Sequence, residues 1–359
     1  MSCVVITCIP SPYQVELFDG LARRAPDFRA VYLSRRDHSR SWASRRLQHA
    51  AMVLDAAEPG YRQFFRWTEA ADLVVFSDYS SKPVREAMRR RATLGKPWCF
   101  WGERPGYHGL GSLGRMRRRL HLAPLHRHRH VPIWGIGKWA IDGYRREFGD
   151  ARPYWNVPYF SDLRRFRVAS AARGAGCKPV RILYCGSLIR RKGVDILARA
   201  FHRLGRQRQE VTLSVAGTGP LRAFMERALS CLGQRVRFHG FVPWEELPNA
   251  YAQADILCAP SRYDGWGLIV PEGMAAAMPV IATDRMGSAL ELLEHGRNGW
   301  RIGADDEDCL YAALCAAVDA APAERLAMGI SAQSRAAGQD VAEGVRCFGK
   351  AMEGTIAAW

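Results

Sequence analysis

PSRYDGWGLIVPEGMAAAMPVIATD, at residues 260–284, is the most informative stretch of the chain. An apolar, strand-like run ends near Pro260, a loop with two glycines follows, and a helix is expected to begin between Leu268 and Pro271. Glycines let a backbone approach a ligand closely, and a helix N-terminus offers free N–H groups. The stretch therefore predicts a strand–loop–helix unit that is suited to a diphosphate.

Two carboxylates bracket this loop, Asp264 at its start and Glu272 in the first helical turn, with seven residues between them. Both can point to the same side, where carboxylates accept hydrogen bonds from sugar hydroxyls. Taken alone, the pattern fits equally well an ordinary loop–helix junction, in which acids favour the positive end of the helix. The stretch alone does not distinguish a ligand-binding loop from an ordinary loop–helix junction, so the other segments of the chain are needed.

Strand-like and helix-like segments alternate on both sides of this stretch. Strands are expected at 181–186, 211–217, 236–241, 255–260, 279–283 and 299–302 in the second half of the chain. In the first half they are expected at 3–9, 28–34, 72–77, 96–101 and 130–137, with helices at 82–94 and 138–148. This alternation predicts parallel sheets covered by helices.

The length of 359 residues fits two domains better than one. We therefore predict an α/β protein with two Rossmann-like domains in tandem, at residues 1–165 and 178–338. The Arg- and Ala-rich stretch 164–178 is interpreted as a linker. Residues 339–359 are predicted to form a helix that packs back on the first domain.

The composition is that of a globular protein, with 48% hydrophobic and 24% charged residues. None of the ten cysteines forms a CxxC pair, which indicates reduced, buried thiols and neither a disulfide framework nor a zinc site. The N-terminus lacks the features of a signal peptide, and no run reaches the about 20 apolar residues of a membrane span. The sequence predicts a cytoplasmic protein that is soluble or peripheral to a membrane.

Three further segments follow predicted strands: GSLIRRKG at 186–193, AGTGP at 216–220 and HGFVP at 239–243. Open α/β sheets bind ligands at the carboxyl ends of their strands. Together with 260–284, and in this order, the segments resemble the donor site of glycosyltransferase family 4 over about residues 180–335. The resemblance implies a GT-B fold, with two Rossmann-like domains facing each other across a cleft, and sugar transfer that retains the anomeric configuration.

The resemblance also assigns roles to single residues. Lys192 matches the residue that pairs with the donor diphosphate and neutralises the leaving group. Glu272 matches the residue that binds the ribose hydroxyls of the nucleotide. Asp264 stands where the family usually has Glu, and its shorter arm would contact the donor sugar. Lys192 and Asp264 are therefore candidate catalytic residues.

The remaining donor contacts are spread over all four segments. The family often has Arg directly after the first glycine, where this chain has Ser187, and Arg190 or Arg191 is the alternative source of positive charge. The backbone of Gly267 and Leu268 would approach the diphosphate and the sugar. The other donor-site positions implied by the resemblance are Gly186, Ser187, Arg191, Gly217, Gly219, Phe241 and Val242.

The first half of the chain offers fewer candidates. Tyr13 follows the first strand and is predicted to line the cleft on the acceptor side. The strand that ends near Gly102 resembles one whose end carries a His in many relatives, and here Glu103 stands there instead. Glu103 is a candidate to orient the acceptor hydroxyl or to act as a base. The alternative for Glu103 is an ion pair with Arg104 or another arginine, and His108 is a further candidate in the loop.

The net charge of +17 is unevenly distributed. Residues 1–165 hold 29 Lys and Arg against 15 Asp and Glu, whereas residues 166–359 hold 23 against 20. No acidic residue occurs from Arg104 to Ile141. Such a basic excess in one half indicates a surface that faces an anionic partner.

The basic stretch contains a helix-like pattern in which Leu113, Met116, Leu120 and Ala123 share one face. The arginines of this pattern are Arg115, Arg117, Arg118 and Arg119. A basic amphipathic helix is typical of a membrane-surface element, and the alternative is a solvated helix with a buried stripe. Nucleic acid is not expected as a partner, because no aromatic stacking platform accompanies the arginines.

The acidic run 305–308 contains an Asp-x-Asp pattern, which holds a divalent metal in other transferases. Here it precedes a helix-like segment, so we interpret these acids as helix-start charges. We predict neither a bound metal nor a cofactor beyond the donor.

Together these observations predict a retaining hexosyltransferase that uses a UDP- or GDP-type nucleotide sugar. The predicted acceptor is a glycan or a polyprenyl-diphosphate-linked or other lipid-linked saccharide, in polysaccharide or glycolipid biosynthesis. The enzyme would lie on the inner face of the cell membrane, on its anionic surface. Two alternatives are a sugar-nucleotide epimerase on the same fold and a non-catalytic module that binds a nucleotide sugar or a nucleic acid.

Overall fold

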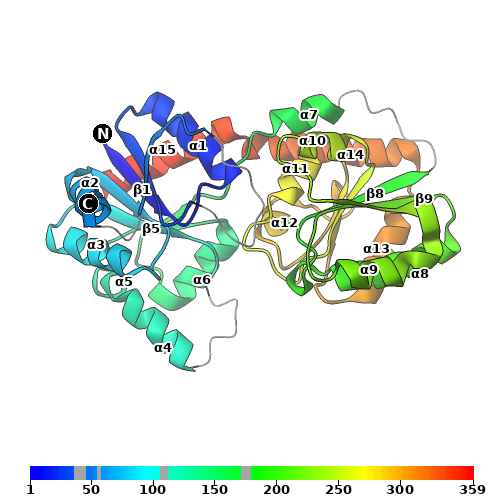
Figure 1. The fold of residues 1–359 in the computed structure, drawn as a ribbon, viewed down its shortest axis with the longest axis horizontal. Helices are drawn as coiled ribbons and strands as arrows, with labels where there is room; N and C mark the ends of the chain where they lie inside the picture. Colours follow the sequence, from blue (N-terminus) through cyan, green and yellow to red (C-terminus); the bar gives the residue numbers. More distant parts are fainter. Residues whose placement is uncertain (36–45, 55–57, 106–111, 171–178) are drawn as a thin grey trace. The chain divides into compact units, whose positions relative to one another are not determined.

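The computed structural model describes residues 1–35, 46–54, 58–105, 112–170 and 179–359 (Figure 1). The chain divides into two compact units. Unit 1 comprises Met1–Ser161 and Val341–Trp359, and unit 2 comprises Asp162–Asp340. Each unit is built around one parallel β-sheet.

Unit 1 holds a seven-stranded sheet with the order β3-β2-β1-β4-β5-β6-β7. Its strands are β1 (Cys3–Thr7), β2 (Phe28–Tyr32), β3 (Ala50–Val53), β4 (Leu73–Phe76), β5 (Trp98–Gly102), β6 (Ile133–Gly135) and β7 (Tyr154–Asn156). Its helices are α1 (Pro12–Arg24), α2 (Glu58–Ala70), α3 (Lys82–Thr93), α4 (Ser112–His121), α5 (Ala123–Arg127), α6 (Lys138–Phe148) and α15 (Val341–Ala357). The five strands predicted in this half are present, and the two edge strands β3 and β7 are additional.

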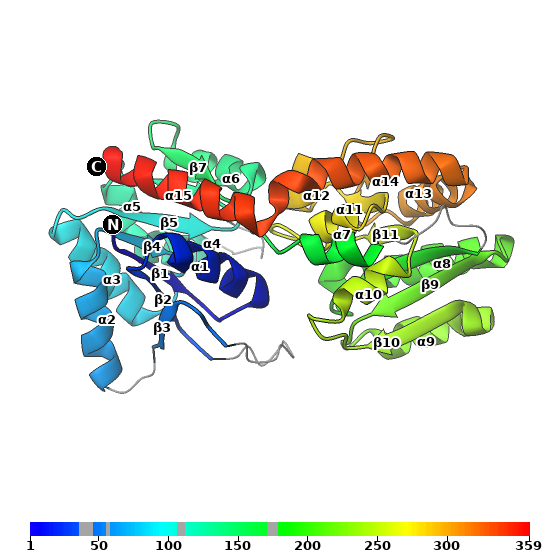
Figure 2. The ribbon, with the colours of Figure 1, turned by 90° about the horizontal axis from the view of Figure 1, so that it is seen from above.

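Alternate residues of the strands in unit 1 face different helices. Phe100 and Ile133 belong to a core that includes α2, α3, α5 and α6. Trp134 faces α15 instead, where its Nε1 donates to Oγ1 of Thr355 at 3.0 Å and its ring lies 5.0 Å from that of Phe348. α15 also lies beside α1 (Figure 2). The C-terminal helix thus packs on the first Rossmann-like unit, as the sequence predicts.

Unit 2 holds a six-stranded sheet with the order β10-β9-β8-β11-β12-β13. Its strands are β8 (Val180–Cys185), β9 (Val211–Ala216), β10 (Val236–Gly240), β11 (Ile256–Ala259), β12 (Val280–Thr283) and β13 (Gly299–Ile302). Its α-helices are α7 (Arg164–Ser170), α8 (Val194–Gln207), α9 (Arg222–Leu229), α10 (Leu247–Ala252), α11 (Ile269–Ala275), α12 (Gly287–Leu292), α13 (Glu307–Asp319) and α14 (Pro322–Ala336). Three 3-10 turns complete it: η1 (Arg190–Lys192), η2 (Ser230–Arg235) and η3 (Ala337–Gln339).

The sequence of β8 is almost entirely apolar, with Arg181 as its one charged residue. Ile182 and Tyr184 pack into a core with α8, α9 and α13, whereas Leu183 and Cys185 pack into a second core with α7, α10, α11, α12 and α14. A parallel strand covered on both faces reads as a continuous apolar run. All six strands predicted in this half are present, although the edge strand β10 has no buried residue.

The predicted linker 164–178 is wrong in its first half. Arg164–Ser170 forms helix α7, whose fully buried Phe166 lies against the ring of Tyr251 at 4.9 Å. Arg167 of the same helix forms an ion pair with Asp340 at 3.6 Å. The rest of the predicted linker lies outside the described residues. The arginines of this segment led to the prediction of a linker, but the buried Phe166 anchors the segment as a helix.

Candidate functional site

The four segments predicted from the sequence lie next to one another at one edge of the sheet in unit 2. The strand order places β10, β9, β8 and β11 side by side, and the carboxyl ends of parallel strands share an edge. Backbone hydrogen bonds join the loops that follow: Leu188 N donates to Thr218 O at 2.8 Å, and Gly217 N donates to Gly240 O at 2.7 Å. The loops thus form one connected rim.

Two glycines allow the loops of this rim to approach each other. A Cβ atom added at Gly217 would lie 1.9 Å from the carbonyl oxygen of Gly186. At Gly219 it would lie 2.6 Å from the carbonyl oxygen of Leu188. Both glycines also have positive φ angles, +152° and +156°, which L side chains rarely adopt. Glycine is therefore required for the loop after β9 to pack against the loop after β8.

Lys192 and Asp264 form an ion pair on this rim. Lys192 ends the η1 turn after β8 and Asp264 follows β11, so two neighbouring strands join residues that are 72 positions apart. Nζ of Lys192 donates to Oδ2 of Asp264, and the two side chains are only 16% and 15% exposed. The structure thus brings together two of the three predicted catalytic residues, Lys192 and Asp264, as a cation held by a carboxylate.

Further contacts tie the turn that carries Lys192 to the loop that carries Asp264. Nη1 of Arg191 donates to the carbonyl oxygen of Tyr263 at 3.0 Å. Ser187 is exposed on the same rim, and its carbonyl oxygen accepts a hydrogen bond from the hydroxyl of Tyr184 at 2.9 Å. Arg191 thus binds the backbone of the opposite loop.

Glu272 is a fully buried carboxylate, whereas Lys192 and Asp264 are partly exposed. It lies in the first turn of α11, and its Oε2 accepts a hydrogen bond from the hydroxyl of Tyr251 at 2.9 Å. Burial raises the pKa of Tyr251 well above its ordinary value, so the phenol stays protonated and donates. Burial, followed by the charge of Glu272, raises the pKa of Cys185 to about 12, so this thiol stays neutral.

Tyr251 was not predicted as a partner of Glu272, and Cys185 was predicted only as a buried thiol. The one feature of the sequence that could have placed Cys185 at the site is its position directly before the loop that begins at Gly186. Tyr251 comes from α10, which the sequence analysis did not predict, and nothing in the local sequence pairs it with α11.

The loop at Gly267 and Leu268 is held from α12. Gly267 has a φ angle of +87°, and Leu268 precedes the first residue of α11. The fully buried hydroxyl of Ser288 donates to the carbonyl oxygens of Trp266 at 2.7 Å and Gly267 at 2.8 Å. Ser288 is a second residue that the sequence analysis missed, and it fixes the backbone predicted to approach the diphosphate.

Phe241 and Val242 follow β10 at the same rim. Phe241 is 42% exposed, whereas Val242 is half-buried against the core of unit 2. An exposed aromatic ring at a strand end offers a flat apolar surface to a planar ligand.

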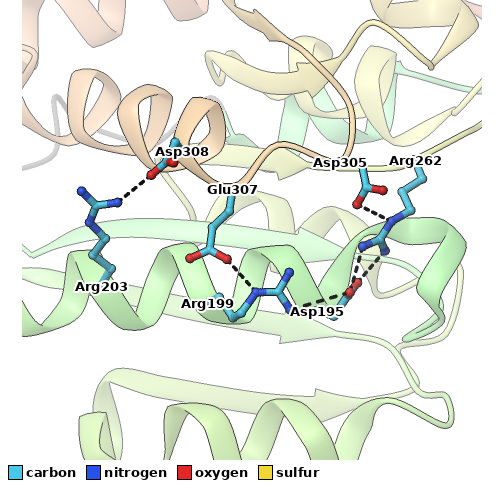
Figure 3. A network of polar contacts seen from close by, with 7 residues as sticks. All are labelled: Asp195, Arg199, Arg203, Arg262, Asp305, Glu307 and Asp308. Atoms are coloured by element: carbon cyan, nitrogen blue, oxygen red, sulfur yellow. Dashed lines mark hydrogen bonds and ion pairs between the residues drawn. The ribbon is translucent and has the colours of Figure 1, made fainter.

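The acidic run 305–308 starts a helix, which confirms the interpretation as helix-start charges. Oδ1 of Asp306 accepts a hydrogen bond from the backbone N of Cys309 at 2.8 Å and caps α13. Glu307 forms an ion pair with Arg199 at 2.6 Å, and Asp308 forms one with Arg203 at 2.8 Å (Figure 3). Across the parts of the chain that the structure describes, no group of three or more His, Cys, Asp or Glu is arranged to hold a metal.

Tyr13 and Glu103 lie in unit 1, after β1 and β5. Tyr13 is in the first turn of α1, and its ring lies 4.9 Å from that of Tyr159. Glu103 is exposed, and its carbonyl oxygen accepts a hydrogen bond from Tyr144 at 2.8 Å. His108 lies outside the described residues. The structure therefore gathers the predicted donor residues in unit 2 and these acceptor candidates in unit 1.

The basic stretch of unit 1 forms two helices, α4 and α5, separated by the buried Leu122. On α4, Leu113, Met116 and Leu120 are 75%, 56% and 67% exposed, so the alternative of a buried stripe is wrong for these three residues. Ala123 instead begins α5. Within the described residues, no helix has both the length and the apolar character of a membrane span.

The arginines of α4 do not all share the exposed surface. Arg117 and Arg119 are exposed. Arg118 was grouped with them from the sequence, but that prediction is wrong, because its side chain is only 10% exposed and pairs with Glu147 at 2.9 Å. The side chain of Arg115 lies outside the described residues.

Comparison with known proteins finds similarity to glycosyl transferases. The family model described as "Glycosyl transferases group 1" matches residues 179–320, which lie within unit 2. The GDP-mannose-dependent alpha-(1-6)-phosphatidylinositol monomannoside mannosyltransferase of Mycolicibacterium smegmatis is 30% identical over 212 residues, 55% of this chain and 55% of that protein. The matched region thus spans about half of this relative.

A second relative is matched over more of its length. The lipopolysaccharide core biosynthesis mannosyltransferase LpsB of Rhizobium meliloti is 30% identical over 256 residues, 64% of this chain and 71% of that protein. Among solved structures, Anabaena HepE in complex with UDP aligns over 99% of this chain and 100% of that chain, with a TM-score of 0.79 at 15% identity. At this identity the likeness concerns the fold alone, and it confirms the predicted pair of Rossmann-like units of the GT-B type.

Proposed function

The chain belongs to the group 1 glycosyl transferases, and we propose that it transfers a hexosyl group from a nucleotide sugar to a glycan or lipid-linked acceptor, with retention. The observation that carries the proposal is the Lys192–Asp264 ion pair on the glycine-containing rim of unit 2. The family model covers the segments that form this rim. The same pair also indicates how the donor would be activated.

Lys192 would bind the diphosphate of the donor. Its ammonium group donates to Asp264. A bound diphosphate would compete for this ammonium group and receive its charge as the bond to the sugar breaks. Asp264 would then accept a hydrogen bond from a hydroxyl of the donor sugar. The backbone N–H groups of Gly267 and Leu268, held by Ser288, would face the diphosphate.

Glu272 and Phe241 would bind the nucleoside. Tyr251 donates to Oε2 of Glu272, and this carboxylate would accept hydrogen bonds from the ribose hydroxyls. Phe241, with Val242, would contact the base. The names of the relatives include both a GDP-mannose-dependent enzyme and a complex with UDP, so both nucleotides are candidates.

The acceptor is proposed to be a saccharide carried by a lipid. The name of one relative refers to phosphatidylinositol monomannoside, and the name of another refers to lipopolysaccharide core biosynthesis. The exposed apolar residues and arginines of α4 would place unit 1 on the anionic inner face of the cell membrane. Tyr13 and Glu103 would contact the acceptor.

Thermal shift with UDP-, GDP-, ADP- and dTDP-sugars tests the donor site. One nucleotide class is expected to stabilise the protein by about 2.7 kcal/mol at 100 times its dissociation constant. The matching nucleoside monophosphate should stabilise it less, because it lacks the second phosphate that Lys192 would bind. If none of the four donors raises the melting temperature, the proposed donor site is wrong.

A separate measurement distinguishes sugar transfer from epimerisation. A transferase should release the nucleotide only when an acceptor is present, whereas an epimerase would convert the donor without one.

Transfer is expected to continue in the presence of EDTA. Lys192 and backbone N–H groups would supply the positive charge that other transferases obtain from a divalent metal. The measurement is nucleotide release with and without the chelator, followed by addition of Mn²⁺ or Mg²⁺. Activity that EDTA removes and a metal restores would contradict this expectation.

A further inference from the structure

Arg262 lies two residues before Asp264, and its guanidinium group is enclosed by two carboxylates (Figure 3). Asp195, in the first turn of α8, accepts from Nη1 at 2.6 Å and from Nη2 at 2.8 Å. Asp305, before α13, accepts from Nε at 2.8 Å. Arg262 thus links the loop after β11 to two other segments of unit 2.

Arg262 also binds the η1 turn directly. Its Nη1 donates to the carbonyl oxygen of Arg190 at 2.6 Å. Its backbone N donates to the carbonyl oxygen of Arg191 at 2.9 Å. These two residues immediately precede Lys192. The side chain and the backbone of Arg262 therefore fix the turn that carries Lys192 against the loop that carries Asp264.

The contact with Asp195 is the stronger of the two ion pairs. Both partners are 15% exposed, whereas Asp305 is 62% exposed. The hydrogen bonds that Arg262 donates to Asp195 raise the pKa of Arg262. Burial raises the pKa of Asp195, but hydrogen bonds from Arg262 bring it below its ordinary value. A bidentate arginine–carboxylate pair fixes geometry as well as charge, which a lysine at the same place would not do.

We infer that Arg262 is a positioning residue, which sets the place of Lys192 relative to Asp264 by clamping η1 to the loop after β11. This inference rests on the proposed function of that pair. Arg262 acts through Lys192, and Asp195 in turn holds Arg262. A misplacement of about 1 Å can reduce a rate about 100-fold, so loss of the clamp should affect turnover while the fold persists.

The kinetic test compares Arg262→Gln and Arg262→Lys with Arg203→Gln as the matched control. Arg203 belongs to the same row of ion pairs, but its partner Asp308 is 88% exposed. We expect Arg262→Gln to lower kcat/KM for the donor at least about 10-fold, with most of the loss in kcat, because the contact of Lys192 with the diphosphate strengthens as the bond to the sugar breaks. Arg262→Lys should recover only part of the loss, and Arg203→Gln should match wild type.

A double-mutant cycle separates positioning from a general structural role. In a Lys192→Ala background, Arg262→Gln is expected to have almost no further effect on kcat, because residues that act through each other are not additive. A full additional loss in that background would overturn the inference. Melting temperatures of all variants show whether each one is folded. Should Arg262→Gln fail to fold, Asp195→Asn, which removes the charge that holds Arg262, takes its place in the cycle.

A second measurement does not depend on activity. Acetylation of Lys192 by acetic anhydride, followed by mass spectrometry, is compared with acetylation of the exposed Lys350. Arg262→Gln should label several-fold faster at Lys192 only, because its ammonium group is no longer held at Asp264, and Arg203→Gln should not. Unchanged labelling and unchanged kcat in folded Arg262→Gln would overturn the inference. A wild-type protein that turns over no nucleotide sugar would instead reject the proposed function, while the labelling result still decides on the clamp.

Discussion

Replacing Lys192 by alanine is expected to lower kcat for sugar transfer by about 100- to 1,000-fold, the loss typical when one charge-stabilising group is removed from a preorganised site. The lysine is the cation on the rim that is paired with Asp264 and mostly buried. Without it, the diphosphate would leave with less compensation for its charge. The measurement is single-turnover transfer with saturating donor, alongside a melting curve.

Two controls make this result specific. Lys350→Ala removes the same charge from an exposed position on α15 and should leave transfer unchanged. Asp264→Asn keeps the lysine and should cost less than Lys192→Ala. Wild-type rates in Lys192→Ala, with donor turnover confirmed, would remove the donor-site assignment.

Glu272 shows what the sequence could and could not reveal about the site. The seven-residue spacing from Asp264 predicts a carboxylate beside the loop, and the structure places it in the first turn of α11. The sequence gives no sign that the carboxylate is buried against Tyr251. Alanine at this position would leave the buried phenol without this partner, at a cost of about 1–3 kcal/mol. Glutamine, which keeps the shape, is therefore the better substitution for testing its role.

The fold was predictable where strands are covered on both faces. β8, β9 and β11 are mostly apolar segments that end in glycine- or proline-containing loops, and each was expected within one or two residues of its observed bounds. β3 and β7 were missed because they are four- and three-residue edge strands that are mostly half-buried, so they lack a distinctive apolar pattern. The Lys192–Asp264 contact forms because β8 and β11 are neighbours in the sheet. The order of the strands is a property of the whole sheet, so the two local segments do not reveal this contact.

Binding to anionic vesicles is expected to depend on α4, through its apolar residues and its exposed arginines together. The variant Arg117→Ser/Arg119→Ser removes two charges, each worth about 1 kcal/mol near an anionic surface, and should weaken binding about 30-fold at low salt. The matched control is Arg145→Ser/Arg146→Ser, which removes two exposed arginines from α6 of the same unit. Arg118 is left in place, because its pair with Glu147 is structural.

The apolar residues make a separate contribution that salt should not remove. Replacing Leu113 and Leu120 by serine deletes two side chains that are 75% and 67% exposed, so the fold should tolerate both changes. Insertion of such side chains into the lipid boundary is driven by burial of apolar surface, whereas the attraction of arginines fades with ionic strength. Sedimentation with anionic and neutral vesicles, at low and high salt, distinguishes the two contributions. If wild type ignores anionic vesicles at low salt, or if the α6 variant loses as much binding as the α4 variants, α4 is not a membrane-binding element.

The affinity for anionic vesicles is also expected to change with pH in a defined direction. Burial, together with the charges of Arg85 and Arg117, lowers the pKa of His121, and burial also lowers that of His130. These imidazoles therefore gain charge only below the ordinary value of about 6.5. Binding to anionic vesicles should be nearly constant from pH 8 to about 6.5 and should strengthen only as the pH falls further. A rise in affinity that is complete above pH 6.5 would show that His121 and His130 are not its source.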